Sequence, residues 1–212
     1  MLARSRTPVA PAGEPPDRAV RARLVAACRR LDSRGLIAGA EGNLSARLRA
    51  GKIAITPSGM RKADVRERDL LTISADGVLS AGQGRGARPS SEMPMHLAIY
   101  AARPDVRAIV HAHPPAATGF AVAGKTLPRG ILAELDDVLG DVPLAPFRRP
   151  GSGELGSVVA QALGQANVAL LARHGAVAVG PSVDVALNLM ESLEQAARIV
   201  LAAHILQGIT DD

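Results

Sequence analysis

The sequence predicts an α/β fold built as one domain over residues 17–212. Apolar residues recur at helical spacing in some segments and at strand spacing in others, and the two kinds of segment alternate along the chain. The length of 212 residues suits one hydrophobic core. Hydrophobic residues make up 47% of the chain and charged residues 21%, which is typical of an ordinary globular protein.

The first part of the chain is expected to contain a tail, a helix and a β-hairpin. Residues 1–16 carry four prolines and no periodicity, so they are predicted to be a disordered N-terminal tail. Helical spacing begins at Asp17, which can cap the helix start, and ends before Gly35. Residues 43–59 alternate in the strand period on both sides of a glycine-containing turn, which predicts a hairpin.

The rest of the chain alternates helices with strands. Residues 89–104 predict a helix entered directly after a loop, with the two serines before it as candidate caps. Residues 106–114 and 167–180 are β-branched runs typical of buried strands, the second interrupted by a His-Gly pair. An amphipathic helix is predicted between them at 155–162, and the longest helical pattern covers 181–208.

The charge distribution argues against a nucleic-acid-binding protein. The formal net charge is +5, but the basic excess lies before residue 89, where 17 Lys and Arg face 8 Asp and Glu. One Tyr, two Phe and no Trp leave almost no side chains on which bases could stack. We therefore expect a solvated, arginine-rich surface and no nucleic-acid partner.

The chain is expected to act in the cytoplasm and not in a membrane. No apolar run approaches the roughly 18–20 residues that a membrane span needs, and the first residues lack the apolar middle of a secretory signal. The single cysteine, Cys28, cannot form an internal disulfide and lies on the apolar side of a helical pattern. It is expected to be a packing residue.

Two of the five histidines, His111 and His113, stand one residue apart at the end of an apolar run. In a strand, residues i and i+2 project from the same face, so the two rings can converge on one ion. Neutral imidazole suits zinc and its first-row neighbours, and catalytic zinc takes three protein ligands. His174 is the third candidate, because it also ends an apolar strand and Gly175 permits close backbone approach there.

Three further residues have a structural interpretation beside any functional one. His96 and His204 lie on helical apolar stripes and are expected to be structural. Glu92 follows two serines at a predicted helix start, where a glutamate ordinarily complements the helix dipole. Beside a metal ion, the same carboxylate could instead act as a general base.

Five short motifs in order make the sequence resemble the class II aldolase/adducin family: "GNLS" at 42–45, "ITPSG" at 55–59, "PSSE" at 89–92, "HAHP" at 111–114 and "ARHG" at 172–175. The resemblance implies a three-layer α/β/α fold around a mostly antiparallel central sheet. It implies a homotetramer with sites between subunits, and one zinc ion per subunit on His111, His113 and His174. It also makes Glu92 the catalytic acid/base.

The same resemblance implies a small phosphorylated sugar as substrate, with its phosphate bound by Asn43, Ser45, Thr56, Gly59, Ser90 and Ser91. Hydroxyls, an amide and backbone N–H groups at a glycine turn and a helix start are suitable donors for a phosphate. Each residue taken alone also suits a turn or a cap. The implied reaction is retro-aldol cleavage of a ketose 1-phosphate to dihydroxyacetone phosphate and a short aldehyde, assisted by the metal ion.

The sequence departs from the family pattern at the aldehyde end of the reaction. Aldolases of the family place a tyrosine between the second and third metal motifs, and Leu132 or a neighbour stands there in this chain. The family's C-terminal tail, with another tyrosine, has no counterpart either. Tyr100 is the only tyrosine, and its place on the helix after Glu92 predicts a structural role.

Three alternative functions stay open at this point. A sugar-phosphate 4-epimerase would share the phosphate and zinc motifs but would also use a tyrosine donor. A decarboxylase of the same family would keep zinc and drop the phosphate pocket. A non-catalytic, adducin-like interaction module would be expected to lose the metal ligands, which this chain keeps.

Overall fold

A computed structural model describes residues 15–80, 86–130 and 132–207 of the chain. The tail predicted for residues 1–16 lies outside the described residues except for its last two, and so does the predicted helix end at Gly208. None of the described helices is long and apolar enough to cross a lipid bilayer.

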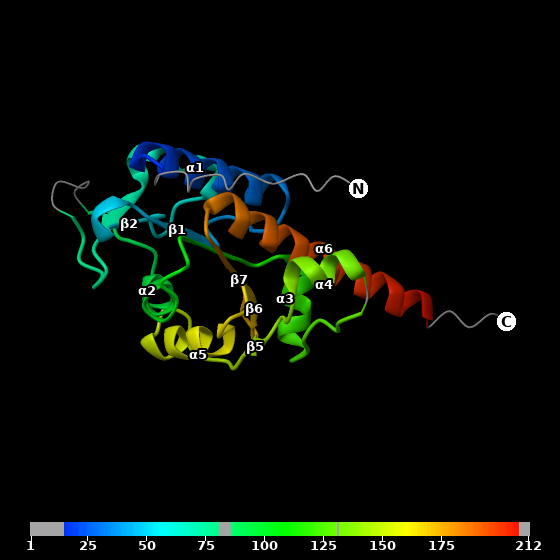
Figure 1. The fold of residues 1–212 in the computed structure, drawn as a ribbon. Helices are drawn as coiled ribbons and strands as arrows, with labels where there is room; N and C mark the ends of the chain where they lie inside the picture. Colours follow the sequence, from blue (N-terminus) through cyan, green and yellow to red (C-terminus); the bar gives the residue numbers. More distant parts are fainter. Residues whose placement is uncertain (1–14, 81–85, 131, 208–212) are drawn as a thin grey trace, which may run out of the picture.

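The centre of the protein is a seven-stranded sheet in the order β3-β2-β1-β4-β7-β6-β5 (Figure 1). Its strands are β1 (Asn43–Arg47), β2 (Ile53–Ile55), β3 (Leu71–Ile73), β4 (Ala108–Ala112), β5 (Leu144–Ala145), β6 (Val168–Leu171) and β7 (Gly175–Gly180). The expected hairpin is confirmed as β1 and β2, with Ser45 opposite Ile55. The run at 167–180 forms two strands, because the chain turns back at residues 172–174 and pairs β6 with β7.

The sheet is mixed, whereas the family resemblance implied a mostly antiparallel one. Among the described residues, β5 and β6 run parallel and the other neighbouring pairs run antiparallel. The reason is the connection between them. The helix α5 (Gly153–Leu163) links β5 to β6, and parallel neighbours need such a crossover instead of a tight turn.

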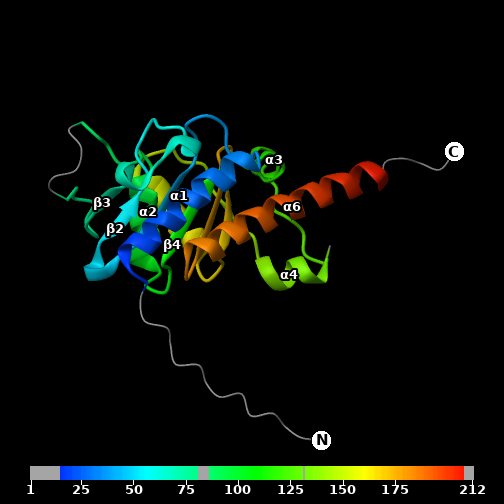
Figure 2. The ribbon, with the colours of Figure 1, turned by 90° about the horizontal axis from the view of Figure 1, so that it is seen from above.

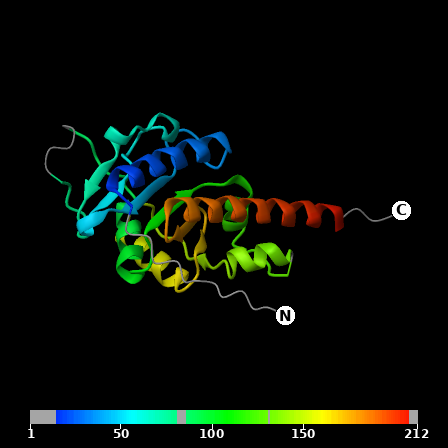
Figure 3. The same cartoon turned by 45° about the horizontal axis from the view of Figure 1, so that its top comes forward.

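Helices cover both faces of the sheet, which confirms the three-layer α/β/α arrangement (Figure 1). One face packs against α1 (Asp17–Ser33), α3 (Pro115–Val122), α4 (Ala133–Leu139) and α6 (Val183–Gln207). The other face packs against α2 (Met93–Ala102) and α5. From above, α1 and α6 lie side by side over their face, and the second half of α6 extends beyond the sheet (Figures 2 and 3).

Two helix starts differ from the expected ones. Helix α1 begins at Asp17 with Pro16 in the capping position, and the Asp17 carboxylate accepts a hydrogen bond from the Arg49 backbone N–H instead of capping its own helix. Helix α2 begins at Met93, so the two serines precede its first turn, and the Ser90 hydroxyl accepts from the Glu92 N–H at 3.2 Å. Glu92 thus occupies the position just before the helix.

Strand β4 distributes its side chains between the two faces. Val110 joins the core beneath α1 and α6, whereas Ile109 joins the core beneath α2. Because side chains alternate along a strand, His111 shares the face of Ile109. The register with β1 sets Asn43 opposite His111 and Ser45 opposite Ile109, so polar side chains of both strands face α2.

A buried carboxylate anchors the chain just after His113. Glu194 on α6 is 3% exposed, and its two oxygens accept hydrogen bonds from the backbone N–H groups of Ala116 and Ala117 at 3.2 and 3.0 Å. Arg198, one turn further along α6, donates to the same carboxylate at 2.7 Å. The negative charge therefore satisfies N–H groups in the first turn of α3, where the helix leaves them without internal partners.

Replacing Glu194 by alanine is expected to lower the free energy of unfolding by about 2–3 kcal/mol, because two buried N–H groups lose a charged acceptor. Chemical denaturation followed by circular dichroism measures the change. Glu191→Ala on the same helix is the matched control. Its ion pair with Arg30 is open to solvent, so this substitution should cost less than about 1 kcal/mol. Equal effects of the two substitutions would contradict the anchoring role.

Candidate metal centre

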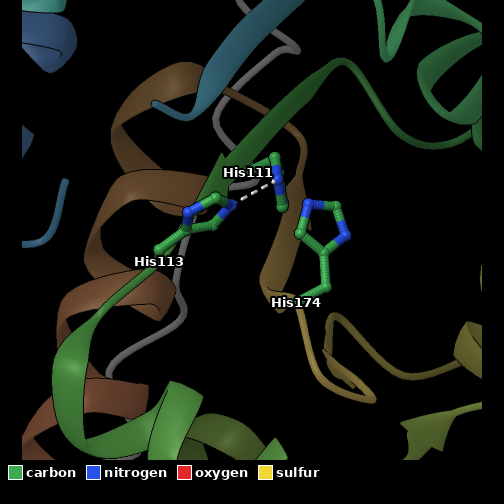
Figure 4. A group of neighbouring side chains, drawn as sticks. All are labelled: His111, His113 and His174. Atoms are coloured by element: carbon green, nitrogen blue, oxygen red, sulfur yellow. Dashed lines mark hydrogen bonds between the residues drawn. The ribbon is translucent and has the colours of Figure 1, made fainter. Parts of the chain in front are cut away.

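Three imidazoles converge at one end of the central strands (Figure 4). His111 lies near the end of β4, His113 two residues later, and His174 in the turn between β6 and β7. These segments meet because β4 pairs with β7, with Ala112 opposite Ala176. The ring centroids lie 4.8 to 5.1 Å apart, and one nitrogen of each ring lies within 4.8 Å of the others.

The donor set fits a divalent metal ion. His111 Nδ1 lies 2.9 Å from the Ala176 carbonyl oxygen, which can only accept, so Nδ1 carries a hydrogen and Nε2 is the nitrogen that a metal ion would use. His111 Nε2 and His113 Nε2 are 3.2 Å apart. Two nitrogens bound tetrahedrally to one zinc ion at about 2.0–2.1 Å lie about 3.3 Å apart. His174 turns its Nε2 toward the other two rings, while its Nδ1 points away from them and is buried without a hydrogen-bond partner among the described residues (Figure 4).

The protonation of the rings also favours metal binding. Burial lowers the pKa of His113 and lowers the pKa of His174 to about 4, with the charge of His111 adding to both effects. Both rings are therefore neutral near pH 7 and offer lone pairs. Burial also opposes charge on His111, but the neighbouring Glu92 carboxylate outweighs it and raises the pKa of that ring.

Glycine at position 175 is required by the close approach of two strands. A Cβ there would lie 2.5 Å from His113 Cδ2 and 2.6 Å from the Ala112 carbonyl oxygen. Both distances are far shorter than van der Waals contact. The expected close backbone approach at Gly175 is thus confirmed, and it is what lets the His113 ring pack against the start of β7.

Gly175→Ala is expected to cost about 1–3 kcal/mol of stability and to weaken zinc binding, since His113 must move to accept the new methyl group. Thermal melting and a zinc titration against a competing chelator measure the two effects. Gly119→Ala, within α3, is the matched control, because its Cβ meets nothing within 4 Å. Alanine in that helix should stabilise by about 0.5–1 kcal/mol and leave zinc affinity unchanged. Undisturbed zinc binding in Gly175→Ala would refute the steric explanation.

Glu92 faces the histidines from the start of α2. Its Oε2 lies 2.9 Å from His111 Nε2, and its Oε1 lies 3.2 Å from His174 Nε2. The Asn43 amide donates to Oε2 at 2.8 Å. Burial alone would raise the pKa of this carboxyl group, but the charge and hydrogen bond of His111, followed by His174 and Asn43, hold it well below its ordinary value. Glu92 is therefore an ionised, largely enclosed carboxylate.

Four of the six residues with an expected phosphate role lie in two segments that the structure joins. The turn at Thr56–Gly59 and the segment at Ser90–Ser91 are linked by the Ser90 N–H to the Thr56 carbonyl at 3.1 Å and by a bridge between the prolines beside them. Gly59 and Ser91 are exposed, and Ser90 is buried. The Thr56 hydroxyl is buried and accepts from the Leu44 N–H at 3.1 Å.

Asn43 and Ser45 occupy the same face of β1 but differ in surroundings. Asn43 contacts Glu92 directly, whereas Ser45 lies deeper, fully buried between His96 and Tyr100. Tyr100, the chain's one tyrosine, is thus turned away from the histidines. Leu132, at the position where the family resemblance leads one to expect a tyrosine, is an exposed residue at the start of α4.

Two residues near the histidines were not singled out for the site from the sequence. Glu41 Oε2 lies 3.3 Å from His113 Nδ1, and this loop glutamate carries no periodic signal that could have indicated the contact. His96 was expected to be structural, yet its Nε2 lies 2.6 Å from Asn43 Oδ1. Its spacing of four residues from Glu92 puts both on one helical face, a signal that was present in the sequence.

Comparison with known proteins adds a family match. The family model described as Class II Aldolase and Adducin N-terminal domain matches residues 22–201. Its range covers most of α1, the sheet and most of α6, and includes every histidine of the cluster.

Named relatives cover most of the chain but carry different activities in their names. A 5-methylthioribulose-1-phosphate/5-deoxyribulose-1-phosphate aldolase of Rhodospirillum rubrum is 36% identical over 180 residues, which are 84% of this chain and 79% of that protein. A 3-oxo-tetronate 4-phosphate decarboxylase of Escherichia coli is 32% identical over 171 residues, 79% of each protein. A solved structure of an L-fuculose 1-phosphate aldolase superposes with a TM-score of 0.82 at 33% identity, covering 89% of this chain and 87% of that one.

Proposed function

Because the chain belongs to the class II aldolase and adducin family, we propose that it is an aldolase that cleaves a ketose 1-phosphate of the fuculose 1-phosphate kind. Breaking the bond between C3 and C4 of such a substrate releases dihydroxyacetone phosphate and a short aldehyde. The enzyme is a lyase, in keeping with relatives named as aldolases. The observation that carries the proposal is the convergence of three imidazoles beside the Glu92 carboxylate.

Class II aldolases are metal-dependent, and the residues that would hold the ion are His111, His113 and His174. We propose one Zn²⁺ per subunit. Three neutral imidazoles add no charge, so an ion held by them keeps its full positive charge and supplies Lewis-acid polarisation of the substrate carbonyl.

Glu92 is proposed to move the proton. Its Oε2 is occupied by the Asn43 amide, while its Oε1 accepts no hydrogen bond among the described residues. Oε1 is therefore the oxygen with lone pairs to spare. We propose that Oε1 takes the proton from the C4 hydroxyl as the bond between C3 and C4 breaks. The same oxygen then gives this proton to C3, so no other proton donor is needed. The Tyr100 hydroxyl is enclosed behind Ser45 and takes no part in these steps.

The phosphate is proposed to bind at the joined segments around Gly59 and Ser90–Ser91, with Asn43 and Thr56 completing the pocket. Ser45 is left out of this proposal, because it is fully buried against His96 and Tyr100. The exposed backbone at Gly59 and the hydroxyl of Ser91 support this pocket, since both can reach a ligand. The Asn43 amide carries two hydrogens, and only one of them is needed for Glu92. In this proposal Asn43 therefore connects the phosphate end of the site with the proton-transfer end.

A homotetramer with sites between subunits and a cytoplasmic location also remain part of the proposal. The exposed apolar surface near the end of α6 is an argument for subunit contacts there. Leu201, Ile205 and Leu206 are exposed there, and a cavity of about 650 Å³ lies between this part of α6 and α3. That cavity is lined mainly by apolar residues and lies away from the histidine cluster.

The experiment that tests the function is a substrate panel with zinc-loaded enzyme. Fuculose 1-phosphate, 5-deoxyribulose 1-phosphate and 5-methylthioribulose 1-phosphate are each supplied, and dihydroxyacetone phosphate is detected by a coupled reduction that consumes NADH. Release from at least one ketose 1-phosphate is the expected result. Zinc content is measured on the same sample, so that a zinc-loaded enzyme that releases no dihydroxyacetone phosphate counts against an aldolase.

The decarboxylase named among the relatives makes decarboxylation the second candidate. It shares the need to stabilise a negative charge beside a carbonyl, which the same metal centre can do. The same panel therefore includes 3-oxo-tetronate 4-phosphate with detection of released CO₂. CO₂ release without any dihydroxyacetone phosphate from the ketose phosphates would replace the aldolase proposal by this one.

A further inference from the structure

His96 is the centre of a buried chain of polar groups that ends at Glu92. Its ring is 0% exposed. Nε2 lies 2.6 Å from Asn43 Oδ1, and Nδ1 lies 2.6 Å from Ser45 Oγ. Ser45 Oγ in turn lies 2.9 Å from the Tyr100 hydroxyl, and the Asn43 amide nitrogen lies 2.8 Å from Glu92 Oε2. Four side chains thus connect the interior of α2 with the carboxylate at its start.

The positions of the hydrogens follow from the Glu92 end of this chain. The Asn43 amide nitrogen donates to Glu92 Oε2 at 2.8 Å, so the Asn43 carbonyl oxygen faces His96. That oxygen only accepts, so the His96 hydrogen is on Nε2. Nδ1 is then the acceptor and receives the Ser45 hydroxyl hydrogen.

The Ser45 hydroxyl hydrogen is used for His96 Nδ1, so the Tyr100 hydroxyl is the donor and the Ser45 oxygen the acceptor in the last hydrogen bond of the chain. Every hydrogen bond in the chain then points toward Glu92. Aligned hydrogen bonds polarise one another, and in a buried site each is stronger than it would be in water. A histidine that only filled core volume would not need one particular tautomer.

We propose that His96 is a positioning residue for Glu92. Its Nε2–H holds the Asn43 amide in the orientation that donates to Glu92 Oε2, and Ser45 and Tyr100 hold the imidazole in that tautomer. Oε1 thereby stays the carboxylate oxygen that accepts no hydrogen bond from the described residues, 3.2 Å from His174 Nε2. This role rests on the proposed function, because it matters only if Glu92 moves the proton.

The opposite tautomer is incompatible with the contacts. With the hydrogen on Nδ1, Asn43 would turn its NH₂ group toward His96 Nε2 and its carbonyl oxygen toward Glu92. Two oxygen acceptors would then face each other at 2.8 Å in a buried site. The ring is also neutral, since burial and the nearby charge of His111 lower the pKa of His96 to about 3, so each nitrogen has one fixed role.

The tautomer is tested directly by ¹⁵N NMR of the zinc-loaded full-length protein labelled at histidine. The His96 signals are assigned by their loss in His96→Gln. We expect a protonated Nε2 and a bare Nδ1 that stay unchanged from about pH 6 to pH 8. A hydrogen on Nδ1, or protonation of both nitrogens within this range, would overturn the proposal. The measurement needs no substrate, so its outcome is independent of whether the aldolase proposal holds.

The positioning role is tested by a double-mutant cycle with Glu92→Gln. His96→Gln alone is expected to lower kcat by about 10–100-fold with zinc stoichiometry retained and KM changed less than kcat. In the Glu92→Gln background, the same substitution should cause no further loss, because the group it positions is gone. If His96→Gln lowers kcat by the same factor in both backgrounds, its role is merely structural and the proposal is wrong.

Two more variants keep the kinetic test decisive. Tyr100→Phe removes one buried oxygen at the far end of the chain and should lower kcat about 2–10-fold, with its effect also absent in the Glu92→Gln background. This variant carries the test if His96→Gln does not fold. Gln161→Ala, on the exposed side of the last turn of α5, is the control and should leave kcat unchanged. An unaltered kcat in both His96→Gln and Tyr100→Phe would refute the proposal.

Discussion

His174→Ala is expected to remove bound zinc and to lower kcat/KM by about a thousandfold or more. A metal ion that polarises a carbonyl contributes several kcal/mol to the stability of the transition state, and each 1.36 kcal/mol corresponds to a factor of about ten in rate. His174 is the best of the three to replace, because it lies in a turn and its Nδ1 bonds no described group. His111 is fully buried, so its loss would disturb folding as well.

Zinc content by mass spectrometry and kcat/KM for the best ketose 1-phosphate are measured on the same His174→Ala sample. Gln161→Ala removes an exposed polar side chain from α5 and should leave both values unchanged. Chelation of the unaltered protein should reproduce the loss of activity, and added zinc should restore it. One bound zinc per subunit with full activity in His174→Ala would remove the basis of the proposed metal centre.

Glu92→Gln is expected to lower kcat by about 10²–10⁴-fold while one zinc per subunit remains bound. Glutamine keeps the size of the side chain and can still accept from Asn43, but it cannot take and return a proton. Because the carboxylate is a neighbour of the three imidazoles and not one of the three, zinc binding should survive. Single-turnover kinetics with a ketose 1-phosphate separate the chemical step from substrate binding.

Glu154→Gln provides the matched control for this result. Glu154 is also a glutamate at a helix start, in the first turn of α5, but its side chain is exposed. If Glu92 only complemented a helix dipole, the two substitutions would have similar small effects on stability and none on kcat. A kcat for Glu92→Gln within tenfold of the unaltered enzyme would contradict the acid/base assignment.

The histidine cluster is the part of the site that sequence patterns predict well. Alternation in a strand is a local rule, so it sets His111 and His113 on the same face without knowledge of the fold. The end of a second buried run then supplied His174. What the patterns did not contain was the pairing of β4 with β7, which brings that turn to the other two rings.

The contacts of Glu92 were beyond the reach of sequence patterns. Asn43 lies opposite His111, 68 residues further along the chain, because of the register of β1 against β4, and this register places its amide against Glu92. Short elements were also missed. Helices α3 and α4 and strands β3 and β5 offer too few turns or alternations for a period to stand out.

The pairing of Asn43 with His111 across β1 and β4 links correct folding to catalytic competence. A slip of one residue between these strands would reverse which side of the sheet each β1 side chain occupies. Leu44 would then point at the Glu92 carboxylate, and the Asn43 amide would point into the core on the other face of the sheet, beneath α1 and α6. A misaligned chain could thus keep all its imidazoles and still be inert, so selection for turnover also acts as selection for a single strand alignment.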